Sequence, residues 1–262
     1  MSPWWNNLFA PSCDVAITQD SITLSQAGKI VASAAISPIV GDDTLHNRIL
    51  LGLRTLIHIA PTSSKRHVNI WLSPSLVPHG VVQIDARAMK AADIETTLKA
   101  YWEDTLDLPA DALAVAYQIQ ADGQSVFTSC CESALVNALE ATLRNANWGI
   151  KNLAPSITKT WNDSSKQIGK RNCCMLVVQD NTLSMGVLHN GQWAAWSNEG
   201  CENTEWPELA KRVTRFCRST GMFDTSSLPV WVYSPHAIGT PNALGLHHWS
   251  LLNIAPTRGM RV

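Results

Sequence analysis

Residues 174–196 read CMLVVQDNTLSMGVLHNGQWAAW. This stretch contains three apolar runs with polar breaks between them, at 174–179, 183–188 and 192–196. The second break includes Asn190-Gly191, a pair that suits the tight turn of a β-hairpin. Apolar residues at helical spacing then predict a helix over about Pro207–Ser219. The sequence therefore predicts three consecutive hairpin-connected strands followed by a helix.

The same pattern occurs near the start of the chain. Three β-like runs are predicted there, at 14–18, 22–26 and 29–36. A helix over about 43–59 and a strand over 68–72 follow. Between the two copies we predict a strand, a helix, a hairpin, a helix and a strand, over 84–88, 93–106, 113–120 with 125–131, 133–147 and 150–154. With two final strands at 230–233 and 249–254, the repeat indicates two half-sheets of related design.

Composition limits the class of protein. The chain has 262 residues, 45% of them hydrophobic, and its 20 basic and 21 acidic side chains give a net charge of −1. Disordered proteins combine low hydrophobicity with high net charge, so that class is excluded. Nucleic-acid binders are normally basic, so we expect no nucleic-acid partner. No apolar run reaches the ~18 residues of a membrane span and no signal-peptide pattern opens the chain, which predicts a cytoplasmic protein.

Four stretches resemble a known family. They are a leader, a helix followed by Gly and a strand, two strands with their turn, and a late strand: Trp4–Phe9, Ala134–Pro155, Met175–Gly191 and Val230–Tyr233. Together they resemble PilM-type pilus-assembly proteins and the GspL-type cytoplasmic domain of type II secretion, which belong to the actin-like ATPase superfamily. The resemblance implies an α+β, actin-like (ribonuclease-H-like) two-lobed fold with an inserted α+β block. It implies a first lobe, an inserted subdomain and a second lobe over 1–83, 84–156 and 157–262.

The nucleotide-binding turns of that superfamily look degenerate in this chain. An actin-like ATPase holds phosphate with free backbone N–H groups in two Gly-rich and Ser/Thr-rich hairpin turns, and an Asp at each turn holds Mg²⁺ and water. The corresponding segments and the third, beside the adenosine, contain no Gly: 17–22, 177–182 and 233–236. We interpret Asp20 and Asp180 as turn formers. We therefore expect a pseudo-ATPase, which is not an enzyme and has no catalytic, cofactor-binding or metal-binding residues.

The resemblance also implies a function and a partner. It implies a non-catalytic scaffold of a type IV pilus or type II secretion-like assembly machine, peripheral to the inner membrane. In the resembled family, an extended cytoplasmic segment of an inner-membrane protein lies in a groove between the first lobe and the inserted block. Here the matching surfaces would come from residues within 13–72 and 84–156. Two alternatives stay open: a divergent nucleotide-dependent ATPase or phosphotransferase of the same superfamily, and an adaptor unrelated to secretion.

The aromatic leader is the candidate contact site. Trp4, Trp5, Leu8 and Phe9 lie in a terminal stretch that is too short to have a core of its own. The leader either folds back on the first lobe or touches the membrane surface or the partner, because Trp favours half-wet interfaces.

Other reactive residues are interpreted as structural. The chain has seven Cys, and the vicinal pairs Cys130-Cys131 and Cys173-Cys174 lie in strand-like runs where reduced Cys packs as a small hydrophobic residue. We expect all seven to be reduced and without metal. The adjacent pair His247-His248 would point to opposite faces of a strand, which argues against one metal ion shared with His236. Ser129 is not supported as a nucleophile, because the sequence contains no GxSxG motif and no His lies near Ser129 in the chain.

Overall fold

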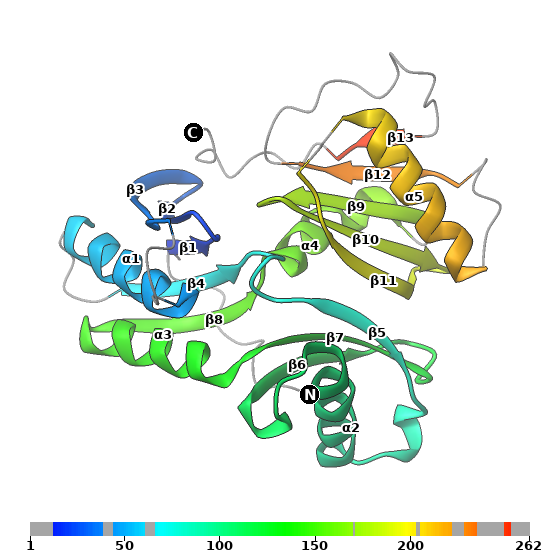
Figure 1. The fold of residues 1–262 in the computed structure, drawn as a ribbon, viewed down its shortest axis with the longest axis horizontal. Helices are drawn as coiled ribbons and strands as arrows, with labels where there is room; N and C mark the ends of the chain where they lie inside the picture. Colours follow the sequence, from blue (N-terminus) through cyan, green and yellow to red (C-terminus); the bar gives the residue numbers. More distant parts are fainter. Residues whose placement is uncertain are drawn as a thin grey trace. The chain divides into compact units, whose positions relative to one another are not determined.

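A computed structural model describes residues 13–38, 44–60, 66–169, 171–202, 205–221, 228–234 and 249–252. Its helices and strands are shown in Figure 1. The described chain divides into two compact units, one of residues 13–76 with 132–159 and the other of residues 77–131 with 160–252.

The first unit is built on a five-stranded sheet in the order β3-β2-β1-β4-β8. Its strands are β1 Cys13–Ile17, β2 Ser21–Gln26, β3 Lys29–Ala35, β4 Arg66–Leu72 and β8 Trp148–Pro155. The central strand β1 pairs antiparallel with β2 and parallel with β4, which in turn pairs parallel with β8. Its helices are α1 Leu45–Ile59, which begins at an N-cap hydrogen bond from Asn47 to the Thr44 side chain, and α3 Ser133–Asn145.

The second unit contains a five-stranded sheet of the same design, in the order β11-β10-β9-β12-β13. Its strands are β9 Cys173–Gln179, β10 Thr182–His189, β11 Gln192–Gly200, β12 Val230–Tyr233 and β13 Trp249–Leu251. Again the central strand pairs antiparallel with its hairpin partner and parallel with the strand on its other side. Helix α5, Trp206–Thr220, packs on one face of this sheet (Figure 1).

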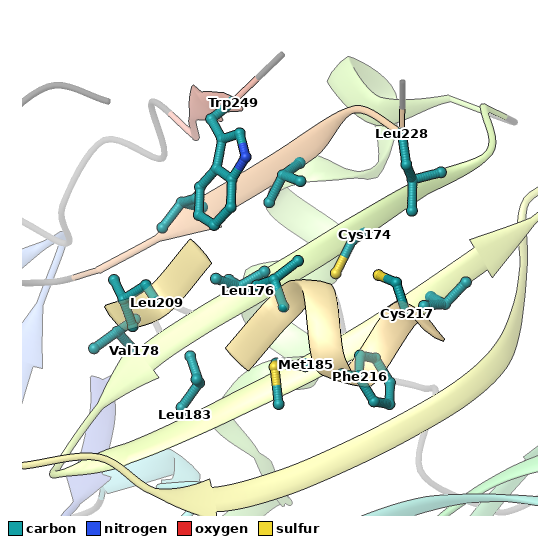
Figure 2. Packing of buried hydrophobic residues seen from close by; sticks show 14 of the residues in the cluster. Cys174, Leu176, Val178, Leu183, Met185, Leu209, Phe216, Cys217, Leu228 and Trp249 are labelled. Atoms are coloured by element: carbon teal, nitrogen blue, oxygen red, sulfur yellow. The ribbon is translucent and has the colours of Figure 1, made fainter. Parts of the chain in front are cut away.

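The core between α5 and the sheet is apolar throughout. Figure 2 shows Leu209, Phe216 and Cys217 of the helix pointing toward the strands, where they meet Cys174 and Leu176 of β9. All five residues are buried.

A third, three-stranded sheet also belongs to the second unit. Its order is β5-β7-β6, with β5 His79–Gln83, β6 Leu113–Ile119 and β7 Ser125–Glu132. Helix α2, Ala91–Leu106, packs on this sheet through Ile94, Leu98 and Trp102, the apolar stripe that its spacing predicts. Single-turn 3-10 helices occur at Ala86–Ala88 and Ala110–Ala112.

The predicted repeat of three strands, a helix and a further strand is confirmed by the matching order and directions of the two five-stranded sheets. One strand prediction was wrong: the strand lies at His79–Gln83, and the predicted segment 84–88 contains a 3-10 helix instead. The ladder stops there because the backbone N–H groups of Ile84 and Ala86 donate to the turn carbonyls of Gln124 and Gly123.

Helix α4, Ser156–Ile168, was not predicted. Its buried positions include Thr160 and Ser164 besides Ile157 and Ile168, so its inner face has no continuous apolar stripe. The hydroxyl of Ser164 donates to the Thr160 carbonyl at 2.7 Å, which satisfies it inside the helix. A pattern based on apolar spacing alone does not find such a helix.

The three segments predicted as lobe, insert and lobe, 1–83, 84–156 and 157–262, stay a prediction. The two compact units divide the predicted insert at Cys131–Glu132, so that its sheet groups with the second five-stranded sheet and α3 with the first.

Candidate functional site

The hairpin turn between β1 and β2 is closed by its own threonine. The hydroxyl oxygen of Thr18 accepts hydrogen bonds from the backbone N–H groups of Asp20 and Ser21, at 3.2 and 2.9 Å. The same hydroxyl donates to the Ser21 carbonyl at 3.0 Å. The backbone N–H of Thr18 donates to that carbonyl as well, at 2.9 Å.

This arrangement does not fit a nucleotide phosphate. A phosphate-binding turn presents backbone N–H groups that no protein atom has satisfied. Here the Thr18 oxygen already accepts from two of the backbone N–H groups of the turn.

The turn between β9 and β10 contains only two residues. Gln179 and Thr182 are paired across the ladder, so only Asp180 and Asn181 lie in the turn. Their φ values are 53° and 55°, which identify a type I′ turn built from the two residue types that best tolerate this conformation after Gly. The carbonyl of Asn181 accepts from the Cys201 backbone N–H at 2.6 Å, which ties the turn to the end of β11. A turn of two residues does not present several consecutive backbone N–H groups to a phosphate.

The strand β12 ends at a partly buried tyrosine. Burial raises the pKa of the Tyr233 phenol, and the carboxylate of Asp163 raises it further. Pro235 and His236, which complete the segment predicted to lie beside an adenosine, fall outside the described residues.

All seven cysteines are buried and free of disulfide bonds. The prediction that the vicinal pairs pack as small hydrophobic residues is confirmed, because each member is at most 8% exposed. Burial raises the pKa of Cys130 to about 11 and that of Cys173 to about 12, so both stay thiols at neutral pH. Within the described ranges, no three His, Cys, Asp or Glu side chains are grouped so that they could hold a metal ion.

A buried histidine lies where the third sheet meets the edge of the second. Nδ1 of His79, on β5, lies 2.8 Å from Oγ of Ser129, on β7. The backbone carbonyl of His79 accepts from Nδ2 of Asn198, on β11, at 2.9 Å. Burial lowers the pKa of His79 to about 3, so the ring is neutral at physiological pH.

The Ser129–His79 pair brings together a hydroxyl and an imidazole that are far apart in the sequence. The two residues are 6% and 3% exposed, which leaves no room for a substrate beside the hydroxyl. The other ring nitrogen, Nε2, has no hydrogen-bond partner, so no third group orients the imidazole as in a catalytic triad. We interpret the pair as structural.

Aromatic rings surround this histidine. His79, Phe127, Trp161, Trp193 and Trp196 form a chain in which neighbouring ring centroids lie 4.8 to 5.9 Å apart. We call these five residues the aromatic cluster. It connects β5 and β7 of the third sheet with β11 of the second, and β5 lies beside β11.

Two side-chain amides complete the connection between these sheets. Gln120, which follows β6, exchanges hydrogen bonds with the backbone of Trp193: its amide donates to the carbonyl, and its oxygen accepts from the N–H. Asn198 accepts from the Trp196 indole N–H at 3.0 Å while it donates to His79. Sequence reasoning missed this junction, because a Gln or Asn in a strand region carries no signal of its distant partner.

The predicted contact residues Trp4, Trp5, Leu8 and Phe9 lie outside the described residues, as do His247 and His248. The predicted peptide groove, with surfaces from 13–72 and 84–156, stays a prediction. Among the described helices, none is long and apolar enough to cross a membrane.

Comparisons with known proteins identify the fold. No protein-family model and no curated protein matches the sequence. A solved structure of the PilM–PilN type IV pilus biogenesis complex matches with a TM-score of 0.62 at 14% identity, over 93% of this chain and 88% of the matched chain. A Bacteroides thetaiotaomicron protein with an actin-like ATPase fold matches with a TM-score of 0.55 at 11% identity, over 89% and 85%.

A third match is the cytoplasmic domain of EpsL, an inner-membrane component of the Vibrio cholerae type II secretion system. Its TM-score is 0.52 at 12% identity, over 95% of this chain and 89% of that one. The predicted resemblance to PilM-type and GspL-type proteins is thus confirmed at the level of the fold. The chain has the α+β, actin-like fold.

Proposed function

We propose that this protein is a non-catalytic scaffold of a type IV pilus or type II secretion-like assembly machine. The observation that carries the proposal is the closure of the first hairpin turn, where the Thr18 hydroxyl takes the N–H groups that would bind phosphate. The two-residue turn after β9 supports the same conclusion independently. The likeness of fold to PilM and to the EpsL domain supports the choice of machine.

The proposed partner is the cytoplasmic segment of an inner-membrane assembly protein. Of the structures with this fold, one is a complex of PilM with PilN and another is a domain of an inner-membrane protein. A protein without a working nucleotide site still needs a specific surface, and an extended peptide can be bound through backbone groups and apolar pockets. We place the protein on the cytoplasmic side, peripheral to the inner membrane, with the leader residues Trp4 and Trp5 as a contact.

A nucleotide titration separates the scaffold from a divergent ATPase or phosphotransferase. A ligand at about one hundred times its Kd stabilises a fold by about 2.7 kcal/mol, which shifts the melting temperature by several degrees. We expect no shift with millimolar Mg-ATP and no phosphate release, with an active actin-like ATPase as the positive control. A clear shift or sustained phosphate release would favour the enzyme.

Peptide binding tests the partner. Peptides copied from the cytoplasmic ends of single-span membrane proteins encoded beside this gene should bind the full chain in calorimetry, while scrambled peptides should not. Replacing Trp4 and Trp5 with Ala should weaken recruitment of the protein to the partner or the membrane without changing the melting temperature. Replacing both with Phe should preserve this recruitment. Absence of binding by every neighbouring peptide would leave the unrelated adaptor as the better interpretation.

A further inference from the structure

The outer face of α5 carries a row of basic side chains. Lys211, Arg215 and Arg218 follow one another at helical spacings of four and three residues, so they lie on one face of the helix. The side chains of Lys211 and Arg215 are 77% and 69% exposed. With the small residues Ala210 and Thr214, these three line a shallow hollow of about 460 Å³. We call Lys211, Arg215 and Arg218 the cationic row.

The opposite face of the same helix is fully used by the core. Trp206, Leu209, Val213, Phe216 and Cys217 are buried against the second sheet, as Figure 2 shows for three of them. The helix therefore cannot turn its apolar face to an outside partner without unfolding this core. Any contact made by α5 has to use its solvent-facing side, which includes the cationic row.

Two carboxylates beside the row offset only part of its charge. Glu199 pairs with Arg212 at 3.6 Å and with Arg215 at 3.1 Å. Glu208 pairs with Arg212 at 3.5 Å and with Lys211 at 3.8 Å. Glu208 is the one acidic residue within α5, so the helix from Lys211 to its end carries four basic side chains and no acidic one.

We propose that the cationic row docks on an anionic phospholipid surface. A protein interface needs a buried apolar or aromatic centre, and α5 exposes none. The exposed large hydrophobic residues of the described chain lie instead on β3, α1 and β6: Ile30, Val31, Leu51, Ile59 and Ile119. Adsorption to an anionic leaflet needs only basic side chains near its surface, each of which strengthens binding about five-fold at low salt. The small Ala210 and Thr214 between the cations let lipid phosphates approach them.

The proposal adds a lipid contact to the peripheral location proposed above. This contact is made by α5 and not by the leader. It is independent of the peptide partner, because peptide binding is measured without lipid. Failure of one therefore leaves the other unaffected.

The test uses the full chain and sedimentation with vesicles. Vesicles of phosphatidylcholine with phosphatidylglycerol should bind the protein, and vesicles of phosphatidylcholine alone should not. The triple variant Lys211→Gln, Arg215→Gln, Arg218→Gln should lose at least tenfold in binding. Raising the salt from about 0.01 M to about 1 M should abolish binding of the unaltered protein.

The control removes the same charge elsewhere. Lys29, Arg54 and Arg144 are exposed residues of the first unit, and their triple change to Gln alters the net charge equally. This control should keep its binding. If both triple variants lose binding alike, the effect is one of net charge and the proposal is wrong. Equal binding to both kinds of vesicle, or none to either, overturns it as well, and an acidic protein partner would then replace the lipid.

Both triple variants should keep the melting temperature of the unaltered protein within about two degrees, since exposed ion pairs contribute little. If the α5 triple variant unfolds, the single change Lys211→Glu serves in its place, and it should still reduce vesicle binding several-fold.

Discussion

The two five-stranded sheets share strand order and directions but differ in how their central strands are buried. All seven residues of β9 are buried, whereas β1 alternates between buried and half-buried positions. Correspondingly, β9 reads as a continuous apolar run and β1 contains Asp14 on its outer face. One topology is thus compatible with burial on one face or on both. The difference predicts that outward-facing positions tolerate change in the first sheet and not in the second.

The largest effect is expected from a methyl group added at Gly186, next to the rings of Trp193 and Trp196. A Cβ on Gly186 of β10 would lie 2.3 Å from a ring carbon of Trp196 and 2.4 Å from one of Trp193. Gly186→Ala should therefore cost about 3 kcal/mol of unfolding free energy. In the first sheet, Gly149→Ala meets the ring of His67 at 2.7 Å, but that side chain is exposed and can move, so we expect about 1 kcal/mol.

Chemical denaturation measures both changes. Gly200→Ala is the matched control on β11, because a Cβ there meets no atom within 4 Å, and it should stay within about 0.5 kcal/mol of the unaltered protein. Equal costs at Gly186 and Gly149 would remove the proposed difference between the sheets.

A second comparison places a hydroxyl on the outward face of each central strand. Val177 of β9 is fully buried and Ala16 of β1 is half-buried. Val177→Thr should cost about 2 kcal/mol, because a buried hydroxyl loses its water without gaining a partner. Ala16→Ser should cost less than about 0.5 kcal/mol. Urea midpoints of the two variants test this, and a tolerant Val177 would mean that water reaches the second face of β9.

Much of this architecture could be predicted, because strand and turn signals are local. The Asn190-Gly191 turn has positive φ at both residues, as predicted. Asp122-Gly123 is also a sequence typical of a type I′ turn, but only Gly123 has positive φ, and the Asp122 carboxylate accepts from the backbone N–H groups of Gln124 and Ser125 instead. A side chain that bonds its own turn changes the turn type without changing the hairpin.

The absence of Gly from the two turns is visible in the sequence, but the hydrogen bonds that close the first turn are not. Thr18 closes its turn through the position of its hydroxyl group, which cannot be predicted from the presence of a threonine in a hairpin turn. The hydrogen bond between Asn198 and His79, beside the aromatic cluster, could not be predicted either, since the two residues are 119 positions apart. Such contacts depend on how sheets meet, which is set by the tertiary structure.

Acid should weaken the second unit selectively. His79 is neutral in the folded protein, with a pKa lowered by burial to about 3, whereas the unfolded chain binds a proton below about 6.5. Stability is therefore nearly independent of this group well above pH 6.5 and falls as the pH drops through 6.5 toward 3. The loss should be about 1 kcal/mol between about pH 6.5 and pH 5.5, because half of the unfolded chains already carry the proton at pH 6.5.

Tryptophan fluorescence reports this unfolding, because Trp196 packs on His79 and Trp193 packs on Trp196. His79→Gln should flatten the dependence in that window, whatever its effect on absolute stability. If the variant keeps the full slope, another group is responsible and the neutral buried ring is not the cause.

The last comparison concerns the two hairpin turns after β1 and β9, which are closed in different ways. Thr18→Val keeps the shape of the side chain but removes the acceptor of the N–H groups of Asp20 and Ser21, so it should cost about 1 kcal/mol. Thr182→Val should cost only a few tenths, because its hydroxyl makes a longer bond, 3.4 Å, to the Asp180 carbonyl. Melting curves of the two variants measure the difference.

The same pair of variants tests whether one turn can be restored alone. Thr18→Val frees two backbone N–H groups, but the turn after β9 still has only Asp180 and Asn181 outside its ladder. We expect phosphate binding to need donors from both turns, so Mg-ATP should leave the melting temperature of Thr18→Val unchanged. A shift of several degrees in this variant, absent from the unaltered protein and from Thr182→Val, would show that the second turn is competent and that the hydroxyl of Thr18 alone blocks the nucleotide.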